Sequence, residues 1–260
     1  MSKVFRAFNG ILVKLFGIKI ALVKAFGEST KLVDETAGKT IVSLRERTMT
    51  SENSLHNLVL AVRYIVKNKI EGDIVECGVW RGGSMMCIAE TLMQLGVERD
   101  LYLYDTFTGM TNPTSVDRDF NGQNASKLMS NSIWRNKKRN FKAGVIAYAN
   151  EDDVRQGMTS TNYPLARTHY IKGDVLDTLS QLKHKKIALL RLDTDWYEST
   201  KKELQQLWPL VTIGGILIID DYDHWVGARN ATDEYFKEQL IEPLLIKLHS
   251  GGRIMIKTKG

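Results

Sequence analysis

The sequence predicts an α/β fold built on a mostly parallel seven-stranded sheet, with helices on both faces and an antiparallel last strand. Three observations lead to this prediction. Short apolar runs rich in branched residues alternate with segments of helical periodicity. Acidic residues directly follow two of these runs, 187–192 and 216–219. The last two apolar runs, 244–248 and 253–257, are joined by Ser-Gly-Gly, and so short a connection requires an antiparallel hairpin.

The composition is that of an ordinary globular protein. The chain has 260 residues, of which 43% are hydrophobic and 25% charged, enough for one large α/β domain with a sizeable core. The net charge is +6, but Lys and Arg are scattered rather than gathered on a recognition helix, so we expect no nucleic-acid partner. Cys77 and Cys87 lack metal-ligand spacing. We expect buried, reduced thiols and a cytoplasmic protein.

The first 27 residues favour a basic amphipathic helix. No apolar run there approaches the roughly 20 residues of a spanning helix, because Lys and Arg interrupt it. Two roles stay open: contact with an anionic membrane surface, and packing on the chain's own domain or on a second copy. We favour the second role, and with it a homodimer or a higher homo-oligomer. Residues 1–47 are thus predicted to form an extension and lid connector, and 48–260 the main domain.

The first strand and the turn after it are typical of a cofactor-binding unit. Ser51 or Asn53 is expected to cap a helix that ends near Asn68, and a strand follows at 73–77. The glycine-rich turn ECGVWRGGS (76–84) then opens a helix that runs to about residue 95. Glycines let a ligand approach the backbone, and a helix N-terminus offers free N–H groups. The spacing matches neither GxGxxG nor the phosphate loop, so tight strand–helix packing is an equal alternative.

The second strand, 101–104, ends at Asp105. An acid there is placed to bind the two hydroxyls of a ribose, although a lone acid is more often a helix cap. Residues 106–150 are too long for a plain connection, so we expect an insertion with helical pieces or a lid over the site. A short helix (151–157) and the third strand (168–172) follow. Gly173 and Asp174 then start another helix.

Aspartates crowd the ends of the fourth and fifth strands, 187–192 and 216–219; helices at 198–207 and 228–240 follow these two strands. The carboxyl ends of parallel strands meet at one edge of a sheet, where ligands bind. Several acids there repel one another unless a cation or shared protons compensate them. The sequence therefore predicts a hard-metal site that polarises an oxygen substrate, formed from Asp193, Asp195, Asp220, Asp221 and Asp223.

In order along the chain, the segments VECGVWRGGS, YLYDTFTGM, IKGDVLDTL, LLRLDTDWYEST and GGILIIDDYDHW resemble the macrocin- and mycinamicin-type sugar O-methyltransferases, the TylF family. The resemblance extends from about Thr48 to the C-terminus. It implies a Rossmann-like class I fold that uses S-adenosylmethionine (SAM) as methyl donor, together with a divalent cation, normally Mg²⁺. The acceptor it implies is a hydroxyl of a sugar or glycosylated small molecule, in natural-product or polysaccharide biosynthesis.

The resemblance also implies roles for individual residues. Those expected around the donor are Glu76, Gly78 and Ser84 at the methionine end, Asp105 at the ribose, Asp174 beside the adenine, and Met49 and Thr50 in a lid. Those expected to hold the metal are Asp193, Asp220 and Asp221. Asp195 is the candidate general base, with His224 as runner-up, and Asp223 has no assigned role. Thr194 and Trp196 depart from the antibiotic-sugar members, which carry small or aliphatic residues there.

The implied chemistry is physically coherent. A sugar hydroxyl is a poor nucleophile at neutral pH, and coordination lowers its pKa and fixes its position for attack on the sulfonium methyl. A carboxylate outside the metal's ligand set can then remove the proton. Two alternatives stay open: a metal-dependent glycosyltransferase that uses the DxD motif, and a non-catalytic, membrane-associated scaffold with the same fold.

Overall fold

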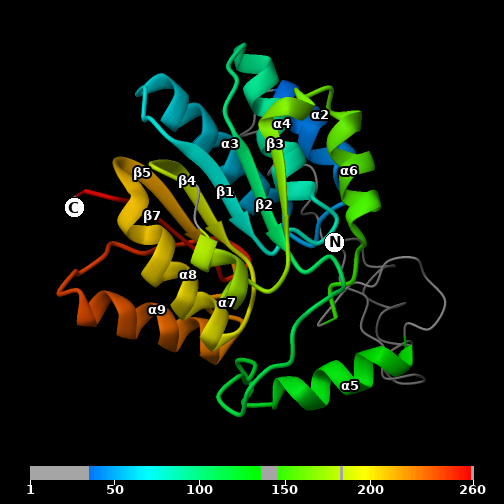
Figure 1. Ribbon diagram of the computed structural model, residues 1–260, viewed down its shortest axis with the longest axis vertical. Coiled ribbons are helices and arrows are strands. Elements are labelled where there is room, and N and C mark those ends of the chain that lie inside the picture. Colours follow the sequence, from blue (N-terminus) through cyan, green and yellow to red (C-terminus); the bar gives the residue numbers. More distant parts are fainter. Residues whose placement is uncertain (1–34, 136–145, 182–183, 259–260) are drawn as a thin grey trace, which may run out of the picture. The chain divides into compact units, whose positions relative to one another are not determined.

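The computed structural model describes residues 35–135, 146–181 and 184–258. They form a seven-stranded sheet in the order β3-β2-β1-β4-β5-β7-β6 (Figure 1). β7 runs antiparallel to both of its neighbours, and the other pairs are parallel. The predicted fold class and antiparallel last strand are therefore confirmed. The strands are β1 (Asp73–Cys77), β2 (Leu101–Asp105), β3 (Thr168–Lys172), β4 (Ile187–Leu192), β5 (Val211–Ile219), β6 (Ile246–Lys247) and β7 (Arg253–Ile256).

Helices cover both faces of the sheet (Figure 1). One face carries α3 (Glu52–Lys67) and α4 (Gly83–Leu95), with α2 (Glu35–Ser43) and α6 (Glu151–Ser160) packed beside them. The other face carries α7 (Val175–Thr178), α8 (Tyr197–Leu207) and α9 (Val226–Glu238). Short 3₁₀ turns lie at η3 (Leu165–Arg167), η4 (Leu179–Gln181) and η5 (Trp208–Leu210).

The central strands are apolar because both of their faces are covered. All six residues of β4 are buried, as are four of the five in β1. A strand buried on two sides reads as a continuous apolar run rather than as an alternation of polar and apolar residues. Cys77 and Cys87 are buried free thiols, as expected.

Local capping explains where the helix before β1 begins. Ser51 adopts an extended backbone, and its hydroxyl accepts a hydrogen bond from the Ser54 amide at 3.2 Å. Ser51, rather than Asn53, is therefore the N-cap, and α3 begins one residue later. α3 ends at Lys67, and Asn68 is its C-cap, as the periodicity predicts.

Three elements differ most clearly from the sequence-based expectation. One is β6, which covers only Ile246–Lys247 of the expected strand 244–248. α2 falls in a segment expected to be a polar connector, because its apolar stripe is short: Ala37, Thr40 and Ile41 are its buried residues. β5 begins at Val211, five residues before the expected start. Its Gly214 has positive φ but donates its amide to Lys257 O, so the glycines bend the strand without ending it.

The insertion between β2 and α6 contains the helix α5 (Ala125–Arg135), in line with the expected helical pieces. Its first half is fixed to the main domain by Asp117, which is fully buried. One oxygen of Asp117 accepts the Tyr197 amide at 2.9 Å, and the other accepts the amide and hydroxyl of Thr114. This carboxylate therefore connects the insertion to the start of α8.

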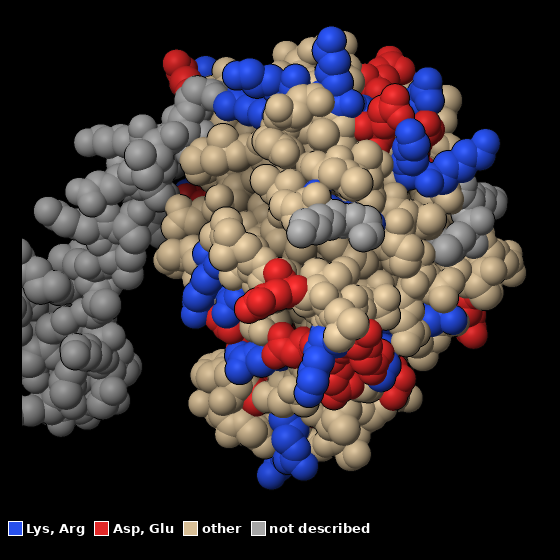
Figure 2. Space-filling view, turned by 90° about the vertical axis from the view of Figure 1, so that its left-hand side faces the viewer, with Lys and Arg blue, Asp and Glu red and all other residues tan. Residues whose placement is uncertain are grey.

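The amphipathic segment 1–27 lies outside the described residues. In the part of the chain that the structure describes, no helix has both the length and the apolar character needed to cross a membrane. On the face shown in Figure 2, acidic and basic side chains are interspersed around a largely uncharged centre. The described residues of this face therefore form no single-sign basic surface of the kind typical of nucleic-acid binding.

Candidate active site

A pocket of about 490 Å³ lies at the carboxyl ends of the parallel strands, within the range of small-molecule sites. Its walls come from the glycine turn, the β2, β4 and β5 ends, the segment before α3 and the start of the insertion. Eleven of the twelve site residues expected from the sequence line it: Met49, Thr50, Gly78, Ser84, Asp105, Asp174, Asp193, Asp195, Asp220, Asp221 and His224. Glu76 is the exception, since it is buried beneath the pocket wall with 1% of its surface exposed.

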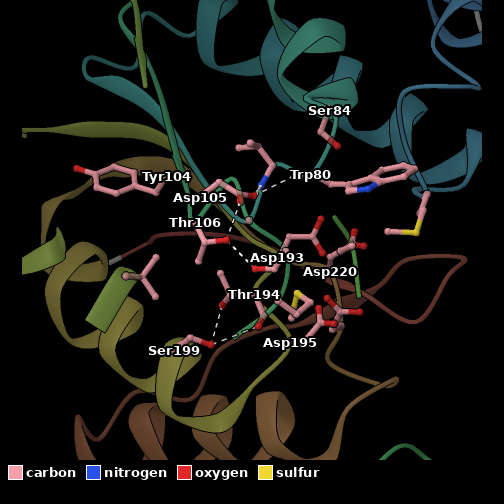
Figure 3. A pocket seen from close by; sticks show the side chains of 18 of the residues that line it. Trp80, Ser84, Tyr104, Asp105, Thr106, Asp193, Thr194, Asp195, Ser199 and Asp220 are labelled. Atoms are coloured by element: carbon pink, nitrogen blue, oxygen red, sulfur yellow. Dashed lines mark hydrogen bonds between the residues drawn. The ribbon is translucent and has the colours of Figure 1, made fainter. Parts of the chain in front are cut away.

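Three of the aspartates form a close group. Oxygens of Asp193, Asp195 and Asp221 all lie within 4.8 Å of one another, a spacing that a single cation can span. Figure 3 shows Asp193, Asp195 and Asp220 on one side of the pocket, apart from Ser84 and Trp80. Asp220 lies beside this group, with its Oδ1 2.8 Å from a guanidinium nitrogen of Arg191. Sequence position alone could not show that Asp220 lies outside the close group of three aspartates.

Burial and mutual repulsion disfavour the ionised forms of these acids. Burial, assisted by the charges of Asp193 and Asp220, raises the pKa of Asp195 to about 7. Burial, with charge repulsion from the neighbouring aspartates, raises the pKa values of Asp193 and Asp221 well above their ordinary range. The pocket floor therefore favours a ligand that brings positive charge.

The residues present fit a hard divalent cation. The candidate ligands are carboxylate oxygens, which such cations prefer. Asp221 Oδ2 is buried and has no hydrogen-bond partner in the structure, and an unpaired buried carboxylate oxygen is costly. Five carboxyl groups (Glu76, Asp193, Asp195, Asp220 and Asp221) meet here, and Arg191 is paired with three of them.

Arg191 lies beneath the pocket with 2% of its surface exposed. Its Nη1 donates to Glu76 Oε1 at 2.5 Å and to Asp193 Oδ2 at 2.6 Å. Its Nη2 donates to Thr50 Oγ1 at 2.9 Å and lies 2.8 Å from Asp220. Burial, only partly offset by Arg191, raises the pKa of Glu76 to about 8. Sequence reasoning missed Arg191, although an arginine inside an otherwise apolar buried strand is a usable signal.

Asp105 organises the glycine turn. Its Oδ2 accepts the amides of Val79 and Trp80 at 2.8 and 3.1 Å (Figure 3), and its Oδ1 accepts the Phe107 amide at 2.7 Å. Trp80 needs this support because its φ is +46°, a strained value for a bulky residue. The carboxylate faces the pocket but already serves three backbone donors. The ribose assignment therefore stays a prediction.

The turn lies directly against the loop that carries the aspartates. A side chain at Gly78, whose φ is +81°, would collide with the Asp193 carbonyl oxygen and touch the Thr194 methyl group. Gly83 has the same role toward the segment before α3, because a side chain there would collide with the Arg47 carbonyl oxygen. The Gly83 amide donates to this oxygen at 3.1 Å. These glycines are required for close backbone approach, which supports the packing alternative as well as the ligand-binding one.

Thr194 is anchored from below by α8. Its hydroxyl lies 2.9 Å from both Ser199 Oγ and Glu203 Oε1. Glu203 is fully buried, and its other oxygen has no partner in the structure. These contacts hold the loop at Asp195, where φ is +70°. Sequence reasoning missed Glu203, although a glutamate on the same helical face as Leu207 and Ser199 is the signal that could have found it.

Aromatic rings line the side of the pocket nearest the insertion. The His224 ring lies 5.8 Å from Phe120 and 4.9 Å from Trp225, centroid to centroid. Trp225 in turn packs edge-on against Trp196, whose indole nitrogen donates to Thr111 O. His224 and Trp225 are the members of this aromatic group that line the pocket. Trp196, which departs from the antibiotic-sugar members, holds the insertion in place rather than leaving space for an acceptor.

The remaining predicted residues are Asp174, Met49 and Asp223. Asp174 lines the pocket and caps α7, with its Oδ1 accepting the Leu176 amide at 2.9 Å. Met49 is half-exposed at the pocket edge. The inclusion of Asp223 in the strand-end metal site is wrong, because Asp223 is turned away to Arg229, Lys247 and Arg253. It ties β7 to the loop after β5.

Comparison with known proteins gives a consistent result. The family model described as macrocin-O-methyltransferase (TylF) matches residues 34–254. Demethyldecarbamoylnovobiocin O-methyltransferase of Streptomyces niveus is 30% identical over 213 residues, covering 82% of this chain and 76% of that protein. An 8-demethyl-8-(2,3-dimethoxy-alpha-L-rhamnosyl)-tetracenomycin-C 4'-O-methyltransferase of Streptomyces olivaceus is 32% identical over 189 residues, covering 72% and 67%.

Solved structures share the architecture. The O-methyltransferase NovP superposes with a TM-score of 0.70 at 28% identity, covering 82% of this chain and 83% of that one. CalS11, a calicheamicin methyltransferase, gives a TM-score of 0.57 at 19% identity, covering 98% and 93%, a likeness that concerns the fold alone.

Proposed function

The chain belongs to the macrocin-O-methyltransferase (TylF) family and is a SAM-dependent O-methyltransferase, and from that premise we propose that it methylates a hydroxyl of a sugar or glycosylated small molecule with the help of a divalent cation. The observation that carries the cation proposal is the close group of Asp193, Asp195 and Asp221, with an unpaired buried oxygen on Asp221. Family membership favours methyl transfer over both a glycosyltransferase and a non-catalytic scaffold.

The donor is proposed to lie along the glycine turn. Gly78 and Ser84 border its methionine end, and Asp105 and Asp174 border the nucleoside, all on the pocket wall. Met49 and Thr50 cover it from the segment before α3. Glu76 acts from beneath through Arg191 rather than by direct contact. The N-terminus of α4, which begins at Gly83, suits the donor's carboxylate.

The cation is proposed to bind Asp193, Asp220 and Asp221. Each keeps a carboxylate oxygen that is not bonded to Arg191, so ion pairing beneath the pocket and coordination within it are compatible. When bound, the cation supplies Lewis acidity that lowers the pKa of the acceptor hydroxyl and fixes its position. Asp195 belongs to the same group of oxygens and is the alternative third ligand.

Asp195 is proposed as the general base. The acceptor oxygen forms a bond to the methyl carbon, the carbon–sulfur bond of SAM breaks, and its electron pair stays on sulfur as S-adenosylhomocysteine leaves. The hydroxyl proton passes to Asp195, and in-line placement of oxygen, carbon and sulfur provides much of the rate. His224, which lines the pocket as part of the aromatic wall, is the alternative base.

A direct assay tests this function. Purified protein is incubated with SAM, Mg²⁺ and a panel of glycosides and nucleotide sugars, and mass spectrometry follows the gain of one methyl group. We expect methylation of at least one sugar hydroxyl, lost in EDTA and restored by Mg²⁺. Full activity in EDTA contradicts the cation proposal, and methylation confined to non-sugar hydroxyls contradicts the acceptor class.

A further inference from the structure

Arg191 joins two parts of the pocket that the proposed chemistry treats as separate. On one side its guanidinium contacts Asp193 and Asp220, which belong to the proposed cation site. On the other it donates to the hydroxyl of Thr50, which belongs to the segment over the donor. A planar guanidinium with five N–H donors can serve several partners at once in one fixed geometry, which a lysine cannot.

The contact to Thr50 and the contact to Asp220 use the same nitrogen. Nη2 lies 2.9 Å from Thr50 Oγ1 and 2.8 Å from Asp220 Oδ1. Positive charge arriving at Asp220 weakens the pull of this carboxylate on Nη2, because the negative charge is then shared. The hydrogen bond from Nη2 to Thr50 then strengthens. A change at the carboxylates is thus transmitted to the donor segment through one buried side chain.

The segment proposed to cover the donor, residues 45–50, has further contacts besides the one between Thr50 and Arg191. Within the segment, the Thr50 amide donates to Thr48 Oγ1 at 3.0 Å. Farther back, Arg47 is fixed to α6, where its Nη1 lies 2.9 Å from both the backbone oxygen and the carboxylate of Asp153. One end of the segment is therefore fixed to α6, and at its pocket end Arg191 holds the Thr50 hydroxyl.

We propose that Arg191 is a positioning residue that couples donor binding to cation binding, by holding Thr50 over the donor when the carboxylates are charge-compensated. The proposal rests on the proposed function of this site. By linkage the coupling is reciprocal: Mg²⁺ raises the affinity for the donor by the same factor as the donor raises the affinity for Mg²⁺. The donor and the cation also repel each other because both are positively charged. The contribution of the Thr50 hydroxyl to the coupling is therefore measured as the difference between variants that keep this hydroxyl and variants that lack it.

Thr50→Val and Thr50→Ser form the matched pair, because valine removes the hydroxyl at nearly constant shape and serine keeps it. Isothermal titration calorimetry measures S-adenosylhomocysteine and SAM affinity with EDTA and with saturating Mg²⁺. For each protein and ligand, the affinity with Mg²⁺ is divided by the affinity with EDTA. We expect this ratio in wild type and Thr50→Ser to exceed that in Thr50→Val by roughly 5-fold or more, within the usual range of coupling. Arg191→Lys, which keeps the charge but not the fixed fork of donors, should behave like Thr50→Val.

Protease protection supplies a second readout that needs no turnover. Cleavage within residues 45–50 should slow when Mg²⁺ is added to donor-loaded wild type and Thr50→Ser, and stay unchanged in Thr50→Val. Equal affinity ratios in wild type and Thr50→Val overturn the coupling proposal while leaving the proposed function intact. Failure of wild type to bind the donor or Mg²⁺ at all instead overturns the proposed function.

Discussion

Glu203 is a buried carboxyl group whose ionisation opposes folding. Burial raises its pKa to about 8 from an ordinary value of 4.5, even though its hydrogen bond with Thr194 acts in the opposite direction. Between these two values the folded chain holds a proton at Glu203 that the unfolded chain has released. The contribution of Glu203 to stability therefore falls as pH rises from about 4.5 to about 8.

Glu203→Gln removes this titration while keeping an oxygen acceptor for Thr194. We expect the decline of unfolding free energy over pH 5–8 to become shallower by up to about 1.4 kcal/mol per pH unit. Urea unfolding at several pH values measures the slope. Glu198→Gln, an exposed change on the same helix, is the control and should keep the wild-type slope. An unchanged slope in Glu203→Gln would show that the group is ionised when folded.

Asp195 and His224 are distinguishable as bases by single substitutions. Asp195→Asn removes the proton acceptor but keeps the shape of the loop, and general base catalysis is worth about 10²- to 10⁴-fold. We expect kcat to fall by that order with the SAM dissociation constant within a few-fold of wild type. His224→Ala should act mainly on the KM of the acceptor, through the aromatic wall. The reverse pattern would assign the base to His224.

At the scale of elements, the glycine turn depends on close contact with the loop after β4. Gly78→Ala places a methyl group against the Asp193 carbonyl and demands positive φ from a residue with a Cβ. We expect a loss of more than about 2 kcal/mol in unfolding free energy, together with weaker SAM binding. Gly38→Ala, in a helix with open space around it, should instead stabilise by about 0.5–1 kcal/mol. Thermal denaturation and calorimetry compare the two variants.

The strands could be predicted closely because burial on both faces leaves an unambiguous apolar run. β1, β3 and β4 begin and end at the expected residues. α2 was missed because its stability comes from packing against α3 and α4, which a weak local stripe does not reveal. β5 was shortened because its two glycines were interpreted as a turn, whereas backbone hydrogen bonds with Lys257, directly after β7, carry the strand through them.

The candidate site could be predicted as a set of residues but not as a network. Strand order alone brings the acids to one edge, so the pocket lining was accessible from the sequence. The division of labour among the acids was not, because it depends on where one guanidinium points. Arg191 pairs with Asp220 and Asp193, and Glu76 lies behind it. Such partners can be far apart in the sequence: Glu76 and Arg191 are separated by more than a hundred residues.

At the scale of the whole molecule, five carboxyl groups and one buried guanidinium form the floor of a pocket whose wall is a donor-type glycine turn. The uncompensated charge makes positive ligands favourable there, and both a divalent cation and the donor's sulfonium satisfy that requirement. The same repulsion that disfavours the ionised forms of these acids therefore favours the binding of both the cation and the donor. Arg191, which pairs with Glu76, Asp193 and Asp220, compensates part of this charge from within the protein.

The most direct test of this account is the cation affinity of Asp221→Asn. Titration of Mn²⁺ followed by electron paramagnetic resonance counts free ion, with exposed Asp152→Asn as a control of equal charge change. We expect wild type and Asp152→Asn to bind the ion in a saturable manner, and Asp221→Asn to lose at least 10-fold in affinity, about 1.4 kcal/mol, along with methyl transfer. Wild-type ion affinity in Asp221→Asn would contradict the assignment of the strand-end aspartates as the cation site.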